Sequence, residues 1–294
     1  MPQPIHGEPR ANLGGIGGTG LYQIEGMTQI QEVAIDTPFG KPSDSFIIGS
    51  LEGTGVAFLP RHGRGHVYMP SEIPQRANMY AFKTLGVEHI IAINSCGSYK
   101  EDIKPGDLVI PDQVIDRTTS RVNTFFGSGL VAHISFAEPF CPELSRILYN
   151  AGKKAGATVH RGGTFVTMEG PAFSTKAESR LYQSWGADII GMTVLPEARL
   201  AREAEICYAS IALVTDYDCW LAREKPVTVD IIISCMNRNV ETAKQIIKLA
   251  VGKVPKTRKC ECQNALKTAF VTAREKIPPE LKRKLKPIIG RYIK

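Results

Sequence analysis

Apolar runs alternate with amphipathic stretches along most of the chain, and this alternation predicts an α/β fold. Strands are predicted at residues 56–59, 87–94, 107–114, 163–168, 187–192 and 208–216. Helices are predicted at 71–85, 142–154, 175–185, 196–204 and 228–250, with Ser71 capping the first and a Thr175–Glu178 capping box opening the third. No internal repeat or low-complexity linker interrupts the series. We therefore expect an α/β fold with a single domain, a central mixed β-sheet flanked by helices.

Composition is that of an ordinary globular protein, with 294 residues, 43% of them hydrophobic and 22% charged. No apolar run approaches the ~20 residues of a membrane span, and the first residues carry no signal-peptide core. These observations predict a cytoplasmic protein without membrane contact.

The formal net charge of +7 is concentrated at one end of the chain. Residues 276–294 hold seven Lys or Arg and one Glu, which accounts for +6 and leaves the remainder near +1. A nucleic-acid footprint is expected to cover a folded face instead of a terminal segment. We expect a main domain over 1–275 and a basic tail over 276–294 that solubilises the protein or contacts a subunit, with no nucleic-acid partner.

Two carboxylates, Asp216 and Asp218, follow the buried strand 208–216. Ligands of α/β proteins bind at the carboxyl ends of strands, so this position favours a binding role. A carboxylate pair accepts hydrogen bonds from an exocyclic amine, and a protonated member donates to a ring nitrogen, which suits an aminopurine. An isolated pair of this kind would equally fit a solvated acidic turn.

Other polar residues follow three further predicted strands and would converge with the acidic pair at one edge of a parallel sheet. Arginine offers a fork of donors matched to phosphate, and hydroxyls and glycine-turn amides add further donors. This candidate oxyanion site consists of Thr19 in the glycine-rich segment 14–20, Arg61, His62, Asn94, Ser95 and Thr193.

The glycine-rich segment formally matches the dinucleotide pattern GxGxxG at Gly15, Gly17 and Gly20. That motif requires a strand before it and a helix after it. Residues 11–13 make a poor strand and residues 21–26 a poor helix start, so we interpret the segment as an anion loop. Motifs of zinc hydrolases, serine hydrolases and P-loop enzymes are absent from the sequence.

Seven cysteines are spread along the chain. Cys96, Cys207 and Cys235 lie in apolar runs and are interpreted as small buried residues. Cys260 and Cys262 form a close pair in a polar stretch, but two thiols fall short of the four ligands of a structural zinc site. We therefore expect no metal site, and a disulfide or free thiols at the pair.

Several motifs together resemble the trimeric purine nucleoside phosphorylase family, and within it the members that act on S-methyl-5'-thioadenosine. They include Gly-Gly-Thr-Gly-Leu, Leu-Pro-Arg-His-Gly-Arg, Ala-Glu-Pro-Phe-Cys-Pro, Met-Glu-Gly-Pro-Ala-Phe-Ser, Trp-Gly-Ala-Asp-Ile-Ile-Gly-Met-Thr and Thr-Asp-Tyr-Asp-Cys-Trp, in family order from about residue 12 to about residue 250. The resemblance implies phosphorolysis of methylthioadenosine to adenine and methylthioribose 1-phosphate, without a metal or organic cofactor. The rival prediction is a phosphorylase for 6-oxopurine nucleosides or methylthioinosine.

The resemblance also assigns roles to individual residues. It implies phosphate contacts from the candidate oxyanion residues, with Asn94 and Ser95 as alternatives, and base or ribose contacts from Met192, Asp216 and Asp218. Phe173 and Ser174 would line the purine pocket. His133 would reach the 5' pocket of a neighbouring subunit, with Phe125 and Phe126 suited to an apolar subunit contact, in a homotrimer or a dimer of trimers. The Cys260–Cys262 pair is similar to that of heat-stable members, which implies a disulfide.

Overall fold

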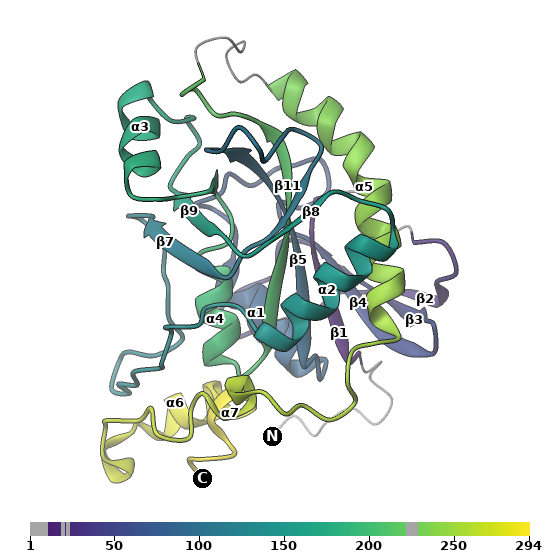
Figure 1. Ribbon diagram of the computed structural model, residues 1–294. Helices are drawn as coiled ribbons and strands as arrows, with labels where there is room; N and C mark the ends of the chain where they lie inside the picture. The colour runs from purple at the N-terminus through teal and green to yellow at the C-terminus, as the bar shows by residue number, and fades with distance from the viewer. Residues whose placement is uncertain (1–10, 19–20, 22–23, 222–228) are drawn as a thin grey trace.

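In the computed structural model, residues 11–18, 21, 24–221 and 229–294 are described, the side chains of 229–238 excepted, and within these residues eleven strands form one mixed sheet (Figure 1). The strands are β1 Leu13–Gly17, β2 Thr28–Val33, β3 Phe46–Leu51, β4 Thr54–Pro60, β5 His89–Ser98, β6 Leu108–Ile110, β7 Gln113–Arg117, β8 Val159–Arg161, β9 Thr164–Met168, β10 Ile189–Gly191 and β11 Cys207–Asp216. The α-helices are α1 Gln75–Thr84, α2 Pro142–Lys154, α3 Lys176–Ser184, α4 Glu197–Glu203, α5 Val229–Val251, α6 Pro279–Lys284 and α7 Lys286–Ile289, with 3-10 turns η1 Glu261–Asn264 and η2 Arg274–Lys276.

The centre of the sheet is parallel and forks at the carboxyl end of β5. Strands β4, β1, β5 and β11 run in parallel, in that order. On one branch β11 pairs antiparallel with β6, and β6 pairs parallel with β8. On the other branch the last residues of β5 pair antiparallel with β10, which pairs parallel with β9, and β9 pairs parallel with β7. A β-bulge between Val214 and Asp216 lies at the fork. Bulges of this kind concentrate next to functional sites, where they re-aim a side chain.

Helices cover both faces of the sheet and divide the core into two main clusters. On one face α2 and α5 pack together and against β11, contributing Leu148 and Ile247 to the core. On the other face α1 and α4 supply Phe82 and Leu200. A smaller cluster holds α3 against β10 through Tyr182. The architecture is the α/β domain, with a central mixed sheet flanked by helices, that the sequence predicts.

The strand β1 corrects one sequence interpretation, because residues judged a poor strand start occupy the middle of the sheet. Leu13–Gly17 is fully buried between β4 and β5. Its glycines leave room for neighbouring side chains. A Cβ would lie 2.8 Å from the Phe82 ring at Gly14, 2.4 Å from the Phe58 ring at Gly15 and 2.2 Å from Leu21 at Gly17. Tertiary packing therefore overrides the low strand propensity of glycine.

Several predicted boundaries also shift for local reasons. The first helix begins at Gln75, with Pro74 at its N-cap position and no side-chain cap, so the predicted Ser71 cap is wrong. The single strand predicted at 107–114 is two strands, β6 and β7, which pair with different neighbours. The capping box of α3 is confirmed, with Thr175 accepting from the backbone of Glu178 and the Glu178 side chain accepting in return.

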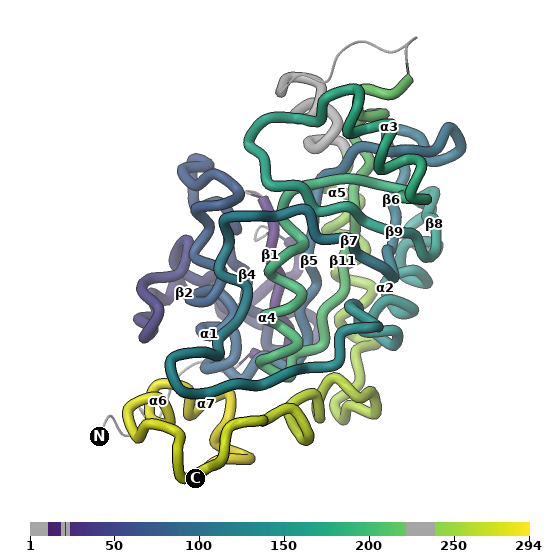
Figure 2. The backbone as a smooth tube through the Cα atoms, turned by 90° about the vertical axis from the view of Figure 1, so that its left-hand side faces the viewer, coloured from purple at the N-terminus to yellow at the C-terminus, as the bar shows by residue number. Residues whose placement is uncertain are grey.

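The C-terminal residues pack at one end of the sheet, where α6 and α7 lie beyond α1 and α4 in Figures 1 and 2. Leu285, Ile288, Ile289 and Ile293 are buried in the same cluster as the sheet and α1. The Tyr80 hydroxyl donates to the carbonyl of Lys284 at 3.0 Å. The segment that the sequence analysis set apart as a basic tail thus contributes apolar side chains to the domain core.

The helices that the structure describes are relevant to membrane insertion. None of them combines the length and the apolar character that a bilayer span demands.

Candidate active site

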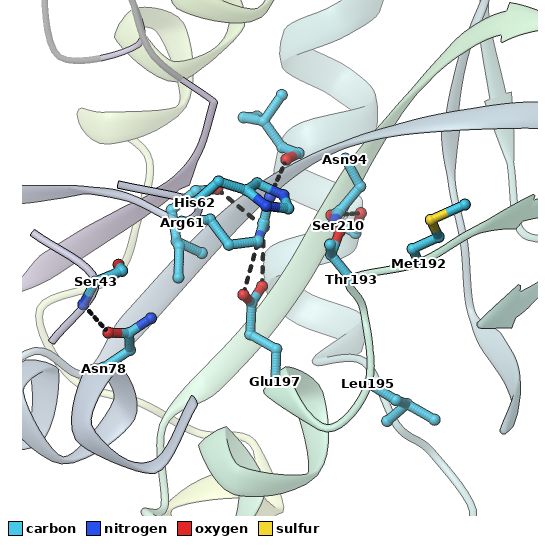
Figure 3. A network of polar contacts seen from close by, with 12 residues as sticks. Ser43, Arg61, His62, Asn78, Asn94, Met192, Thr193, Leu195, Glu197 and Ser210 are labelled. Atoms are coloured by element: carbon cyan, nitrogen blue, oxygen red, sulfur yellow. Dashed lines mark hydrogen bonds and ion pairs between the residues drawn. The ribbon is translucent and has the colours of Figure 1, made fainter. Parts of the chain in front are cut away.

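Arg61, which directly follows β4, is buried and held by the helix that opens after β10. Its Nε and Nη2 donate to the two carboxylate oxygens of Glu197 at 2.8 and 2.9 Å (Figure 3). Nη1 donates to the carbonyl of Ile93 at 2.7 Å, and Nη2 also donates to the carbonyl of Ile16 at 3.2 Å. Arginine has five N–H donors, so these contacts leave one N–H on Nη1 for a ligand.

Glu197 is itself fully buried and was not identified from the sequence. Besides Arg61, it accepts a hydrogen bond from the Tyr208 hydroxyl on β11 at 2.7 Å. Although burial opposes it, the Glu197 carboxylate raises the pKa of Arg61, so the guanidinium stays charged. A bidentate, satisfied ion pair of this type fixes the geometry of Arg61.

His62 lies beside Arg61 as a neutral, partly buried imidazole. Its Nδ1 is 2.9 Å from the carbonyl of Tyr68, and because a carbonyl only accepts, Nδ1 carries the proton. Burial lowers the pKa of His62 to about 4, and the charge of Arg61 adds to the effect. The free Nε2 of His62 is therefore an acceptor for a proton, as on the hydroxyl of a phosphate ion. The ring stacks on His66 at 4.1 Å between centroids.

Asn94 and Thr193 are brought together by the antiparallel pairing of β5 with β10 (Figure 3). Asn94 Nδ2 donates to Thr193 Oγ1 at 2.8 Å, and Asn94 Oδ1 accepts from Ser210 Oγ at 2.8 Å. Since Thr193 Oγ1 already accepts from Asn94, its own proton is free to point at a ligand. Asn94 and Ser95 were predicted to end their strand, but β5 continues to Ser98. Alternation along β5 turns Ser95 to the face opposite Asn94.

Asp216 ends β11, and its carboxylate is enclosed by its own loop. Oδ1 accepts from the backbone N–H of Asp218 at 2.7 Å, and Oδ2 lies 2.7 Å from Thr215 Oγ1. Thr215 Oγ1 is also 3.2 Å from the carbonyl of Cys96. The Thr215 hydroxyl has one proton, which it can donate either to the Cys96 carbonyl or to Asp216 Oδ2. Both contacts are hydrogen bonds only if Thr215 donates to the carbonyl and a protonated Asp216 donates to Thr215 Oγ1. Burial raises the pKa of Asp216, against the hydrogen bonds from Thr215 and Asp218, which favours that protonated form.

Gly97 on β5 makes room for this acidic loop. A Cβ at Gly97 would lie 2.8 Å from Asp216 Oδ1 and 3.2 Å from the backbone nitrogen of Asp218. Asp218 is buried and adopts a positive φ of 51°, a conformation that aspartate tolerates better than most residues. The two carboxylates therefore occupy one tight turn at the fork of the sheet.

The predicted purine-lining turn lies against the same loop. The thiol of Cys219 donates to the carbonyl of Ser174 at 3.3 Å, and Trp220 Nε1 donates to the carbonyl of Ser98 at 2.8 Å. Phe173 is 42% exposed, so its ring is available to a ligand. On the other side of the turn, a Cβ at Gly170 would lie 2.5 Å from the sulfur of Met192. The close packing places Met192 next to the turn.

Arg121 connects these parts and was missed by the sequence analysis. Its side chain is only 2% exposed. It donates to the carbonyl of Leu195 at 2.7 Å and to that of Glu169 at 2.6 Å, and pairs with the Glu169 carboxylate at 3.3 Å. It also donates to the carbonyl of Met192. Arg121 thereby ties the purine-lining turn to the segment that carries Thr193.

Other predicted positions have different outcomes. Thr19 lies outside the described residues. His133 is exposed, with its backbone nitrogen donating to the carbonyl of Ala269 at 2.9 Å. Phe125 and Phe126 are 3% and 8% exposed within the chain's own core, so the prediction that they form an apolar subunit contact is wrong.

The cysteines supply the one group of thiols in the described residues that could hold a metal ion. Cys260 and Cys262 are joined by Cys141 and Cys207, so four thiols come together instead of the two that the sequence analysis considered. The group lies among the side chains of the α2–α5 face, away from the acidic turn.

Comparisons with known proteins agree with this geometry. Residues 12–251 match the family model described as the phosphorylase superfamily. An S-methyl-5'-thioadenosine phosphorylase from Geobacter sulfurreducens is 55% identical over 282 residues, covering 96% of this chain and 99% of the relative. One from Koribacter versatilis is 53% identical, covering 96% of this chain and 97% of the relative.

Solved structures show the same likeness. A methylthioadenosine phosphorylase sourced from an antarctic soil metagenomic library has a TM-score of 0.91 and 49% identity, covering 95% of this chain and 99% of that chain. A methylthioadenosine phosphorylase from Schistosoma mansoni in complex with adenine has a TM-score of 0.82 and 39% identity, covering 88% of this chain and 96% of that one. The chain therefore belongs to the phosphorylase superfamily and, within it, to the family of its S-methyl-5'-thioadenosine phosphorylase relatives.

Proposed function

We propose that this chain converts S-methyl-5'-thioadenosine and phosphate to adenine and S-methyl-5-thioribose 1-phosphate, a pentosyl transfer of purine and methionine salvage. The observation that carries the proposal is Asp216, whose burial raises its pKa at the end of β11, beside the purine-lining turn. A carboxyl group that holds its proton can donate it to a departing purine. The names of the relatives support the same reaction.

The leaving group is activated by the acidic turn. Asp216 donates to N7 of adenine as the glycosidic bond loosens toward an oxocarbenium-like state. Asp218 accepts from the 6-amino group. A 6-oxopurine would present an acceptor to this carboxylate, and two acceptors repel, so the alternative reaction on 6-oxopurine nucleosides is disfavoured.

Phosphate is bound by the groups that follow β4 and β10. Thr193 donates its oriented hydroxyl, Arg61 its remaining N–H, and His62 Nε2 accepts from the phosphate hydroxyl. Asn94 holds Thr193 and offers its second Nδ2–H, and Thr19 completes the set, whereas Ser95 points to the other face of β5 and is left out of it. The bound anion attacks the sugar from the face opposite the purine and offsets the positive charge that develops there.

The remainder of the substrate lies between these two ends. Met192, Phe173 and Ser174 contact the purine and ribose, and His133 of a neighbouring subunit closes the 5' pocket. The assembly is a homotrimer or a dimer of trimers, which follows the closed symmetry usual for homo-oligomers. The reaction needs no metal or organic cofactor because phosphate is the co-substrate. We place the enzyme in the cytoplasm, without a nucleic-acid partner.

A phosphate-dependent adenine-release assay tests the reaction, with methylthioadenosine, adenosine and inosine compared side by side. Methylthioadenosine should turn over only with phosphate, and inosine should be slower by up to ~10⁴-fold, as expected when a polar site rejects a mismatched analogue. Equal turnover of inosine, or adenine release without phosphate, would overturn the proposal.

A further inference from the structure

Four thiols from three separate parts of the chain meet at the edge of the α2–α5 face. Cys141 is the N-cap of α2, Cys207 is the first residue of β11, and Cys260 and Cys262 flank the start of η1. Their four Sγ atoms all lie within 4.8 Å of one another, and Cys207 Sγ is 3.3 Å from Cys260 Sγ. Cys141, Cys207 and Cys262 are buried, and Cys260 is partly buried.

The arrangement has the dimensions of a tetrahedral metal site. Zinc binds thiolate sulfur at about 2.3 Å, which places the four sulfurs of a tetrahedron about 3.8 Å apart. A disulfide would need about 2.05 Å between two sulfurs. The thiols form one mutual cluster, with each sulfur near all three others. Small shifts of each side chain would bring all four into a zinc coordination sphere.

The surroundings suit the charge that such a site would carry. Four thiolates around Zn²⁺ leave a net charge of −2, with the thiol protons released to solvent. The backbone N–H of Cys262 lies close to the sulfur of Cys260, and Arg202 contributes positive charge near Cys262. Amide and cationic neighbours of this kind stabilise ligating thiolates.

We propose that Cys141, Cys207, Cys260 and Cys262 bind one structural Zn²⁺ ion. All four coordination positions are filled by protein sulfur, so the ion has no open position for a substrate. Its role is to clamp the chain after α5 to α2 and β11. Residues beyond the clamp bind the segment that carries His133, because Val131 N donates to Thr272 Oγ1 and Ala132 bridges to Phe270. The ion thus stabilises the support of that exposed segment without touching the reacting atoms.

The first test measures metal in the full chain, purified without chelator or reductant. Mass spectrometry of the acidified protein should find about one zinc per chain. A mercurial reagent that titrates thiols should release this zinc as the four cluster thiols react. Replacement of the ion by Co²⁺ should produce the visible absorption of a tetrahedral thiolate site.

Variants locate the ion. Cys262→Ser and Cys141→Ser should lose the zinc and lower the melting temperature, whereas Cys260→His should retain it because histidine also ligates zinc. Cys96→Ala, which removes a thiol in the cluster of the opposite sheet face, should keep about one zinc per chain. Metal-free wild-type protein would overturn the proposal. Thiols would then be counted on the denatured chain. Three free thiols would show that the four cluster cysteines form two disulfides in place of the metal site, and seven would show that all the cysteines are free.

Discussion

The two ends of the candidate site are built differently. At the phosphate end, Arg61 and Asn94 are 2% exposed, and their side chains are held by buried partners on three strands and a helix. At the purine end, Asp216 is held mainly by its own loop, and Phe173 is 42% exposed. The difference indicates that the end with Arg61 and Asn94 is a preformed part of the core, whereas the end with Asp216 and Phe173 is more open.

The largest expected effect is on turnover, at the purine end. Asp216→Asn keeps the shape of the side chain but removes its acidic proton, so kcat should fall by ~10²–10⁴-fold while stability changes little. Steady-state kinetics with methylthioadenosine and urea unfolding measure the two quantities. Asp102→Asn, at an exposed turn, is the control and should keep full activity. Near-normal kcat in Asp216→Asn would remove Asp216 from the leaving-group role.

Glu197→Gln should instead act on stability, because it leaves the buried guanidinium of Arg61 without its partner. Breaking a buried pair of this kind costs about 3–5 kcal/mol of unfolding free energy. The control is Glu32→Gln, which breaks an exposed ion pair: the side chain of Glu32 is 51% exposed and that of its partner Arg64 is 42% exposed. This change should lower the free energy of unfolding by at most about 1 kcal/mol. Equal losses in both variants would show that the phosphate end is not set apart by its burial.

Gly97→Ala connects the two ends, since this β5 position lies against Asp216. The added methyl would stand 2.8 Å from Asp216 Oδ1 and displace the carboxylate. A displacement of this size should reduce kcat by roughly 10²-fold. Gly252→Ala adds a methyl into open space and should leave kcat unchanged. A fully active Gly97→Ala enzyme would mean that the position of the acidic turn is not critical.

The lowered pKa of His62 should make the stability of the protein depend on pH. The unfolded side chain binds a proton near pH 6.5 and the folded one only near pH 4, so stability falls as pH drops through this range. The loss assigned to His62 is up to about 2 kcal/mol, and His62→Asn should remove that part of the slope. Burial also lowers the pKa of His89 to about 4, so part of the slope should persist in His62→Asn. Chemical unfolding at pH 7, 5.5 and 4.5 measures the slopes, and an identical slope in His62→Asn would contradict the assignment.

The sequence predicts those features of the fold and site that depend on local patterns, and misses those that depend on long-range packing. Asp216, Arg61 and Thr193 each follow a strand whose apolar run is visible in the sequence, so their positions at strand ends could be predicted. Glu197 and Arg121 could not, because their roles depend on which distant backbone and side-chain groups pack against them. The strand β1 was missed since Phe58 and Phe82, far along the chain, fill the space above its glycines. The cysteine cluster escaped notice because Cys141 and Cys207 join the Cys260–Cys262 pair only in the folded chain.

The most direct test of the account is calorimetric titration of inorganic phosphate into the protein without purine. The wild type and Asp216→Asn should bind phosphate with the same affinity, because the preformed end does not include the acidic turn. Thr193→Val should bind about 10- to 100-fold more weakly, since it removes one oriented donor to a charged ligand and leaves Asn94 unpaired. Loss of phosphate binding in Asp216→Asn, or unchanged binding in Thr193→Val, would contradict the separation of the two ends.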